Sequence, residues 1–134
     1  MDASVLVGVL LGRPDAIDEL ERELHGAEHE ALHAPDLIEP ETLNALARLV
    51  RARTITQDRA QQAVVHLAEA RLVRYPHAPL RARVWALREA LSGYDATYLA
   101  VTEALGDGVL LTADEGLATV ATRTMGADRV RLLA

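Results

Sequence analysis

The sequence predicts an α/β fold in which helices flank a mainly parallel sheet. Short apolar runs alternate along the chain with longer amphipathic segments, which is typical of strands separated by helices. Half of the 134 residues are hydrophobic and a quarter are charged, as in folded proteins with a continuous core. Repeats, linkers and low-complexity segments are absent, so we expect residues 1–134 to form one domain.

The first third of the chain contains an apolar run, a helix, a strand and a second helix. Val5–Leu11 is apolar and is followed by a Gly-Arg-Pro break. Asp15–Leu24 has the period of an amphipathic helix. Leu32–Ile38 is short and partly apolar, which favours a strand. Pro40 suits the first turn of the next helix, expected over Glu41–Arg53, because its missing N–H has no partner to lose there.

The middle of the chain contains two further helices and a strand. Thr56 is a plausible N-cap for a helix over Gln57–Leu72, whose apolar residues recur with a helical period. Arg71–Tyr75 is expected to pair as a strand. Pro79–Leu91 has apolar residues on one side and predicts another helix, with Trp85 near its inner face.

The last third alternates between helices and strands. A helix is expected over Tyr94–Leu105, because Gly106 is a normal C-terminal signal. Val109–Thr112 reads as a buried strand, Glu115–Thr122 as a short helix and Val130–Leu133 as a final strand.

Composition excludes several classes of function. The chain has no Cys, which removes thiol nucleophiles and thiolate metal sites, so any metal must be held by oxygen or imidazole. It has neither an apolar run long enough to span a bilayer nor a signal peptide, and a cytoplasmic protein is expected. The net charge of -6 is uneven, since the middle is rich in Arg and both ends are acidic. This pattern suits either solvated helix faces or an acidic pocket beside a phosphate-binding surface.

Four acids lie at the ends of expected elements. Asp114 follows an expected strand, Glu41 and Asp95 lie in the first turns of helices, and Asp2 precedes the first apolar run. The carboxyl ends of parallel strands meet at one edge of a sheet, where helix N-termini also gather. These acids could therefore converge there and bind Mg²⁺ or another hard divalent cation.

Each acid also has a purely structural interpretation. An acid in the first turn of a helix stabilises the macrodipole by about 0.3–1 kcal/mol, which alone could explain Glu41 and Asp95. Asp114 could be only an N-cap, and Asp2 only a surface residue beside the amino terminus. Pattern alone leaves both interpretations open.

Four blocks of sequence go further, because together they resemble a PIN domain of the VapC-type ribonuclease toxins. They are DASVLV (2–7), PDLIEPETLNALARLV (35–50), YDATYLAVTEALG (94–106) and LLTAD (110–114). They occur in the order and at about the spacing found in that family. The resemblance implies a PIN-like three-layer sandwich, with a mainly parallel central sheet flanked by helices.

The resemblance also implies roles for individual residues. Asp2, Glu41, Asp95 and Asp114 correspond to the acids that bind one or two Mg²⁺ or Mn²⁺ ions and act in catalysis. Ser4, Asn44 and Thr112 correspond to polar neighbours that support the acids. The implied activity is hydrolysis of RNA phosphodiester bonds, and the implied partners are an antitoxin protein and a second copy in a homodimer. Arg48 and Arg51, near the Glu41 helix, are candidates for contact with RNA phosphates.

One feature departs from the family pattern. Family members have several apolar residues before the first Asp, whereas here only Met1 precedes Asp2. We therefore expect a misassigned start. If the chain is complete as given, its first strand is stunted and Asp2 is poorly held.

Other classes of function compete with the ribonuclease. A PIN-fold module that binds an antitoxin or RNA without cleavage is the main alternative. A nucleotide-binding regulatory domain is a second, but GVLLG (8–12) lacks the Lys-Ser/Thr of a phosphate loop. Ser4 and Thr112 have no triad context for a nucleophilic hydrolase. Trp85 and the Tyr residues are interpreted as core or interface residues rather than base-stacking platforms.

Overall fold

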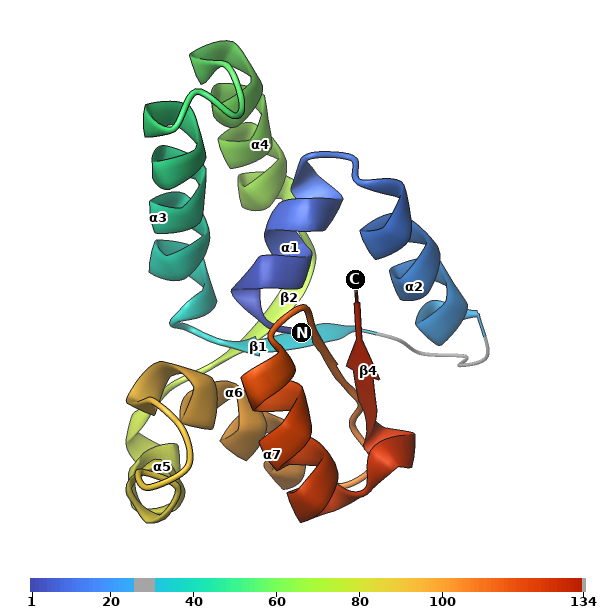
Figure 1. The fold of residues 1–134 in the computed structure, drawn as a ribbon, viewed down its shortest axis with the longest axis vertical. Helices are drawn as coiled ribbons and strands as arrows, with labels where there is room; N and C mark the ends of the chain where they lie inside the picture. The colour runs from blue at the N-terminus through green and yellow to red at the C-terminus, as the bar shows by residue number, and fades with distance from the viewer. Residues whose placement is uncertain (26–30, 134) are drawn as a thin grey trace.

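A computed structural model describes residues 1–25 and 31–133 of the chain (Figure 1). Within these residues, the α-helices are α1 (Ala3–Leu10), α2 (Pro14–Leu24), α3 (Ile38–Arg51), α4 (Gln57–Glu69), α5 (Arg81–Ala86), α6 (Gly93–Ala104) and α7 (Glu115–Met125). The strands are β1 (Leu32–Pro35), β2 (Leu72–Tyr75), β3 (Leu110–Thr112) and β4 (Val130–Leu132), and short 3₁₀ turns span Ala78–Leu80 and Ala127–Arg129.

The strands form two parallel pairs, β1 with β2 and β3 with β4. Met1 and Asp2 lie between the pairs. The amino group of Met1 is 3.4 Å from the carbonyl oxygen of His33 in β1, and the backbone N–H of Asp2 donates to Leu111 in β3 at 3.0 Å. The α/β class and the parallel pairing are thus confirmed, with the strands in two parallel pairs rather than in one continuous sheet.

The first apolar run of the sequence forms helix α1, which is buried on nearly every side. Asp2 is its N-cap, with a side chain that accepts from the backbone N–H of Val5. Helix α2 packs closely against α1, since a Cβ added at Gly8 would lie 2.9 Å from the Cβ of Ala16. The helix expected at Asp15–Leu24 is therefore confirmed, and it covers the central helix α1 (Figure 1).

Several boundaries differ from those expected. Strand β1 ends at Pro35 and α3 already begins at Ile38, so Pro40 lies in its first turn as predicted. The helix expected at Pro79–Leu91 is reduced to a 3₁₀ turn and six residues of α5, and the turns that follow Ala86 bury Leu87 and Leu91 in the core.

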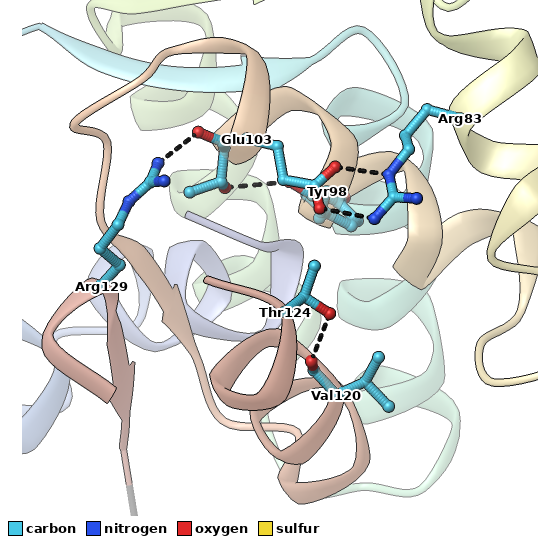
Figure 2. Close-up of polar contacts among 7 residues, drawn as sticks. Arg83, Tyr98, Glu103, Val120, Thr124 and Arg129 are labelled. Atoms are coloured by element: carbon cyan, nitrogen blue, oxygen red, sulfur yellow. Dashed lines mark hydrogen bonds and ion pairs between the residues drawn. The ribbon is translucent and has the colours of Figure 1, made fainter. Parts of the chain in front are cut away.

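Helix α6 forms the centre of the fold. Every residue from Ala96 to Thr102 is buried, so this helix is apolar all round rather than amphipathic. Arg83 on α5 forms an ion pair with Glu103 on α6, at 2.7 and 2.8 Å for its two hydrogen bonds (Figure 2). None of the helices in the described part of the chain has the length and apolar character needed to cross a membrane.

Candidate metal and RNA site

The four acids singled out in the sequence line one cavity of about 580 Å³. They reach it from four separate places: the N-cap of α1, the first turns of α3 and α6, and the N-cap of α7. The remaining lining residues are Ala3, Ser4, Leu37, Pro40, Asn44, Ala45, Arg48, Tyr94 and Tyr98.

Asp2 is held more firmly than its position near the start of the chain predicts. One carboxylate oxygen accepts from the hydroxyl of Ser4 at 2.5 Å and from the backbone N–H of Val5 at 3.2 Å. The other accepts from the hydroxyl of Thr112. Asp2 is 4% exposed. In the chain as given, hydrogen bonds with α1 and β3 therefore fix Asp2, whereas for that case a poorly held Asp2 was expected; the misassigned start stays a prediction.

Thr112 and Ser4 connect Asp2 to the turn that carries Asp114. The hydroxyl of Thr112, which donates to Asp2, also accepts from the backbone N–H of Asp114 at 3.0 Å. The hydroxyl of Ser4 accepts from the backbone N–H of Ala113 at 3.1 Å. Both supporting residues thus join the first acid to the fourth.

Asp114 combines a structural position with access to the cavity. One of its oxygens accepts from the backbone N–H of Leu117 at 2.8 Å, so Asp114 is the N-cap of α7, as the structural interpretation predicted. It also lines the cavity. Capping and metal binding are therefore compatible at this residue, because a carboxylate has two oxygens and several lone pairs.

Asp95 is not needed as a cap. The hydroxyl of Ser92 is the N-cap of α6 and accepts from the backbone N–H of Asp95 at 3.1 Å. Burial raises the pKa of Asp95 above its ordinary value, and repulsion from Asp114 and Asp2 raises that pKa further. Positive charge in the cavity would relieve both effects.

Glu41 is held by a residue that sequence reasoning placed only in the core or an interface. The phenol of Tyr98, on α6, donates to a carboxylate oxygen of Glu41, on α3, at 2.9 Å. Burial raises the pKa of Glu41, the hydrogen bond from Tyr98 lowers it, and the charges of Asp95 and Asp2 raise it. The sequence did hold a sign of this role, because Tyr98 lies one turn after Asp95 on the same helix and therefore on the same face.

The basic and amide candidates divide into two groups. Asn44 and Arg48 follow Glu41 along α3 and line the cavity. Arg51, one turn beyond Arg48, is exposed but is not among the lining residues. Arg48 is therefore the better placed of the two arginines to meet a phosphate at the acids.

The donor set of the cavity fits a hard divalent cation. Its ligating groups are carboxylates and the side-chain amide of Asn44, and oxygen ligands are those preferred by Mg²⁺ and Mn²⁺. In the part of the chain that the structure describes, no three acidic or histidine side chains are close enough to share one ion. Mg²⁺ commonly takes only one or two protein carboxylates and keeps several waters, so its binding does not require such a cluster.

The chain is similar to known proteins over most of its length. The family described as PIN domain matches residues 1–122. VapC ribonuclease Mb0985 from Mycobacterium bovis is 35% identical over 114 residues, covering 85% of this chain and 84% of the relative. Ribonuclease VapC1 from Mycobacterium tuberculosis is 37% identical over 121 residues, covering 88% and 86%. Ribonuclease VapC3 from the same species is 34% identical over 118 residues, covering 88% and 83%.

Proposed function

Because the chain belongs to the PIN domain family, we propose that it is a metal-dependent endoribonuclease, the toxin of a toxin–antitoxin pair. The observation that carries this proposal is the single cavity lined by Asp2, Glu41, Asp95 and Asp114. The similarity to VapC ribonucleases over most of the chain supports RNA as the substrate.

We propose that Mg²⁺ or Mn²⁺ binds among the four acids, with one or two of the carboxylates as direct ligands and the others acting through bound waters. When bound, such an ion supplies a water of lowered pKa and positive charge that stabilises the phosphoryl transition state. Asp2, fixed by Thr112 and Ser4, provides a rigid carboxylate whose orientation is set before any ligand arrives. Glu41 and Asp95, whose pKa values are raised, gain most from a cation, because ionisation costs them most without one.

The remaining polar residues position these acids and the substrate. Tyr98 orients the carboxylate of Glu41 by its hydrogen bond. Asn44 supplies a neutral donor and acceptor one turn further along α3, and Arg48 presents a guanidinium to a phosphate at the mouth of the cavity. Arg51 is proposed only as a more distant contact with the RNA backbone.

The partners of the protein follow from the same assignment. By resemblance to VapC-type toxins, we propose that residues 1–134 act as one domain in a homodimer that is inhibited by a cognate antitoxin. Its site of action would be the cytoplasm, where its RNA substrate is found.

The proposal is tested by RNA cleavage with the purified protein, with Mg²⁺ or Mn²⁺ and with a chelator. Asp95→Asn should abolish metal-dependent cleavage. Asp58→Asn is the matched control. Like Asp95 on α6, Asp58 is an acid in the first turn of a capped helix, here α4 with Thr56 as its N-cap, but it does not line the cavity. Wild-type protein that binds an antitoxin but never cleaves RNA would instead be a binding module that has lost catalysis.

A further inference from the structure

A second cavity, of about 510 Å³, lies beside the acidic one. We call it the aromatic pocket. It is lined by Leu37, His77, Ala78, Arg81, Val84, Trp85, Arg88, Gly93, Tyr94 and Thr97. Leu37 and Tyr94 line both cavities, so the aromatic pocket adjoins the proposed cleavage site.

Two large aromatic side chains are left in solvent in this pocket. Trp85 is 67% exposed and Tyr94 is 64% exposed, so of the core and interface interpretations the core is excluded for both residues. The chain has one Trp, three Tyr and no Phe, which means that half of its large aromatic residues lie on this small surface. Exposed aromatic surface gathered in one hollow indicates a binding site rather than chance exposure.

The pocket is also lined by two arginine side chains, of which Arg88 has the exposed carboxylate of Glu89 at 3.7 Å. The guanidinium carbon of Arg88 lies 4.6 Å from the centroid of the Trp85 ring, a cation–π contact that covers part of the indole. Arg81 lines the same hollow, and within residues 1–25 and 31–133 it forms no ion pair with a carboxylate. Flat apolar faces beside two guanidinium groups suit a ligand that is planar and anionic at once.

Unpaired nucleotides have this combination of properties. Single-stranded RNA exposes the faces of its bases, which stack on aromatic rings or on guanidinium planes, while its phosphates pair with Arg. In a duplex the bases stack on one another and cannot enter such a hollow. Trp, Tyr and Arg are also common at protein interfaces, but the shared wall with the acidic cavity favours the substrate as the occupant.

We infer that the aromatic pocket binds an unpaired base of the RNA substrate next to the cleaved phosphodiester, with Trp85 and Tyr94 stacking on the base. Arg81 and Arg88 contact the flanking phosphates. This inference rests on the proposed function and deepens it, because it assigns Trp85 and Tyr94 as the residues that hold the base beside the cut.

Trp85 is the only Trp of the chain, so intrinsic fluorescence reports on this pocket directly. The experiment titrates the wild-type protein with a short mixed-sequence oligoribonucleotide in the presence of a chelator, which removes the metal that cleavage requires. An abasic oligonucleotide of the same length and charge is the matched probe. We expect saturable quenching by the first probe and none by the second. Equal quenching by both probes, or none by either, would overturn the inference.

Variants provide a second measurement, the anisotropy of a labelled oligonucleotide. Trp85→Ala and Tyr94→Ala should each weaken binding by roughly 5- to 150-fold, the usual range for loss of one stacked base. Trp85→Phe and Tyr94→Phe keep a ring and should retain most of the affinity. Val65→Ala, on an exposed part of α4, should change nothing. Unchanged binding by both alanine variants would refute the inference.

The outcomes also separate this inference from the proposed function. Base-dependent quenching without any RNA cleavage would refute the ribonuclease and leave the base-binding pocket standing. If the wild-type protein cleaves RNA but Trp85→Ala binds RNA normally, the ribonuclease stands and the base-binding pocket is refuted. If Trp85→Ala binds RNA normally but turns a wild-type dimer into monomers, the pocket is a subunit interface and the inference is wrong.

Discussion

The hydroxyl of Thr112 donates a hydrogen bond to the carboxylate of Asp2, a residue 110 positions away in the sequence. The same hydroxyl accepts from the backbone N–H of Asp114. Thr112 is completely buried and Asp2 nearly so. One side chain at the end of β3 therefore fixes the first and fourth acids of the proposed site relative to each other.

The first prediction concerns this connection. Thr112→Val keeps the shape of the side chain but leaves a buried carboxylate oxygen of Asp2 and the N–H of Asp114 without their partner. We expect a loss of about 1–3 kcal/mol in the free energy of unfolding, because unsatisfied buried polar groups carry that penalty. RNA cleavage should also fall, since Asp2 becomes less ordered.

Thr112→Ser is the control for this prediction, because it retains the hydroxyl. In urea denaturation the free energy of unfolding should decrease from wild type to Thr112→Ser to Thr112→Val, and the rate of RNA cleavage should decrease in the same order. If the Ser and Val variants were equally stable and equally active, the hydrogen bond would have no part in holding the site.

The second prediction concerns the phenol of Tyr98, whose hydrogen bond lowers the pKa of Glu41 against the effect of burial. Tyr98→Phe removes the bond, so the pKa of Glu41 should rise further. Glu41 must be ionised to hold a cation, and therefore the acidic limb of the pH–activity profile should move to higher pH. Tyr75→Phe is the control, since it removes a phenol bonded to His33 outside the site. If Tyr98→Phe and Tyr75→Phe had the same pH–activity profile, Tyr98 would have no effect on the ionisation of Glu41 during cleavage.

The positions of the helices and of the acids could be predicted because they depend on local patterns. Amphipathic periods located α2 and α4, and the order of the four blocks placed the acids at the ends of elements. The apolar run after Asp2 gave no period that distinguishes a strand from a buried helix, and tertiary packing against α2 and α3 decides that it is α1.

The contacts that complete the site depend on how elements are rotated against each other, which local patterns do not encode. The bond between Tyr98 and Glu41 requires a particular face of α6 to meet α3. Trp85 was expected in the core or at an interface, and its 67% exposure on α5 excludes the core. The contact of Tyr98 and the exposure of Trp85 both depend on the direction in which a side chain points from an element whose existence was predicted.

A third prediction tests the close packing of α1 on α2. Gly8→Ala places a methyl group 2.9 Å from the Cβ of Ala16, whereas Gly93→Ala, at the start of α6, meets no atom within 4 Å. Both changes favour helix over coil, so the difference between the variants isolates the clash. Thermal or urea denaturation should show Gly8→Ala to be less stable than Gly93→Ala by about 1–3 kcal/mol. Equal stability would mean that α1 and α2 can separate without cost.

The last prediction joins pH, metal and stability. Burial and repulsion from neighbouring acids raise the folded-state pKa values of Glu41 and Asp95 above those of the unfolded chain. The folded state therefore binds more protons, and stability that is present at mildly acidic pH is lost as pH rises through the raised pKa values. Mg²⁺ or Mn²⁺ should restore it, so the melting temperature should increase more on adding metal at neutral pH than at mildly acidic pH. In a Glu41→Gln, Asp95→Asn double variant the metal-free protein should keep its stability at neutral pH and respond little to metal. A metal response in this variant as large as that of the wild type would show that the ion binds elsewhere.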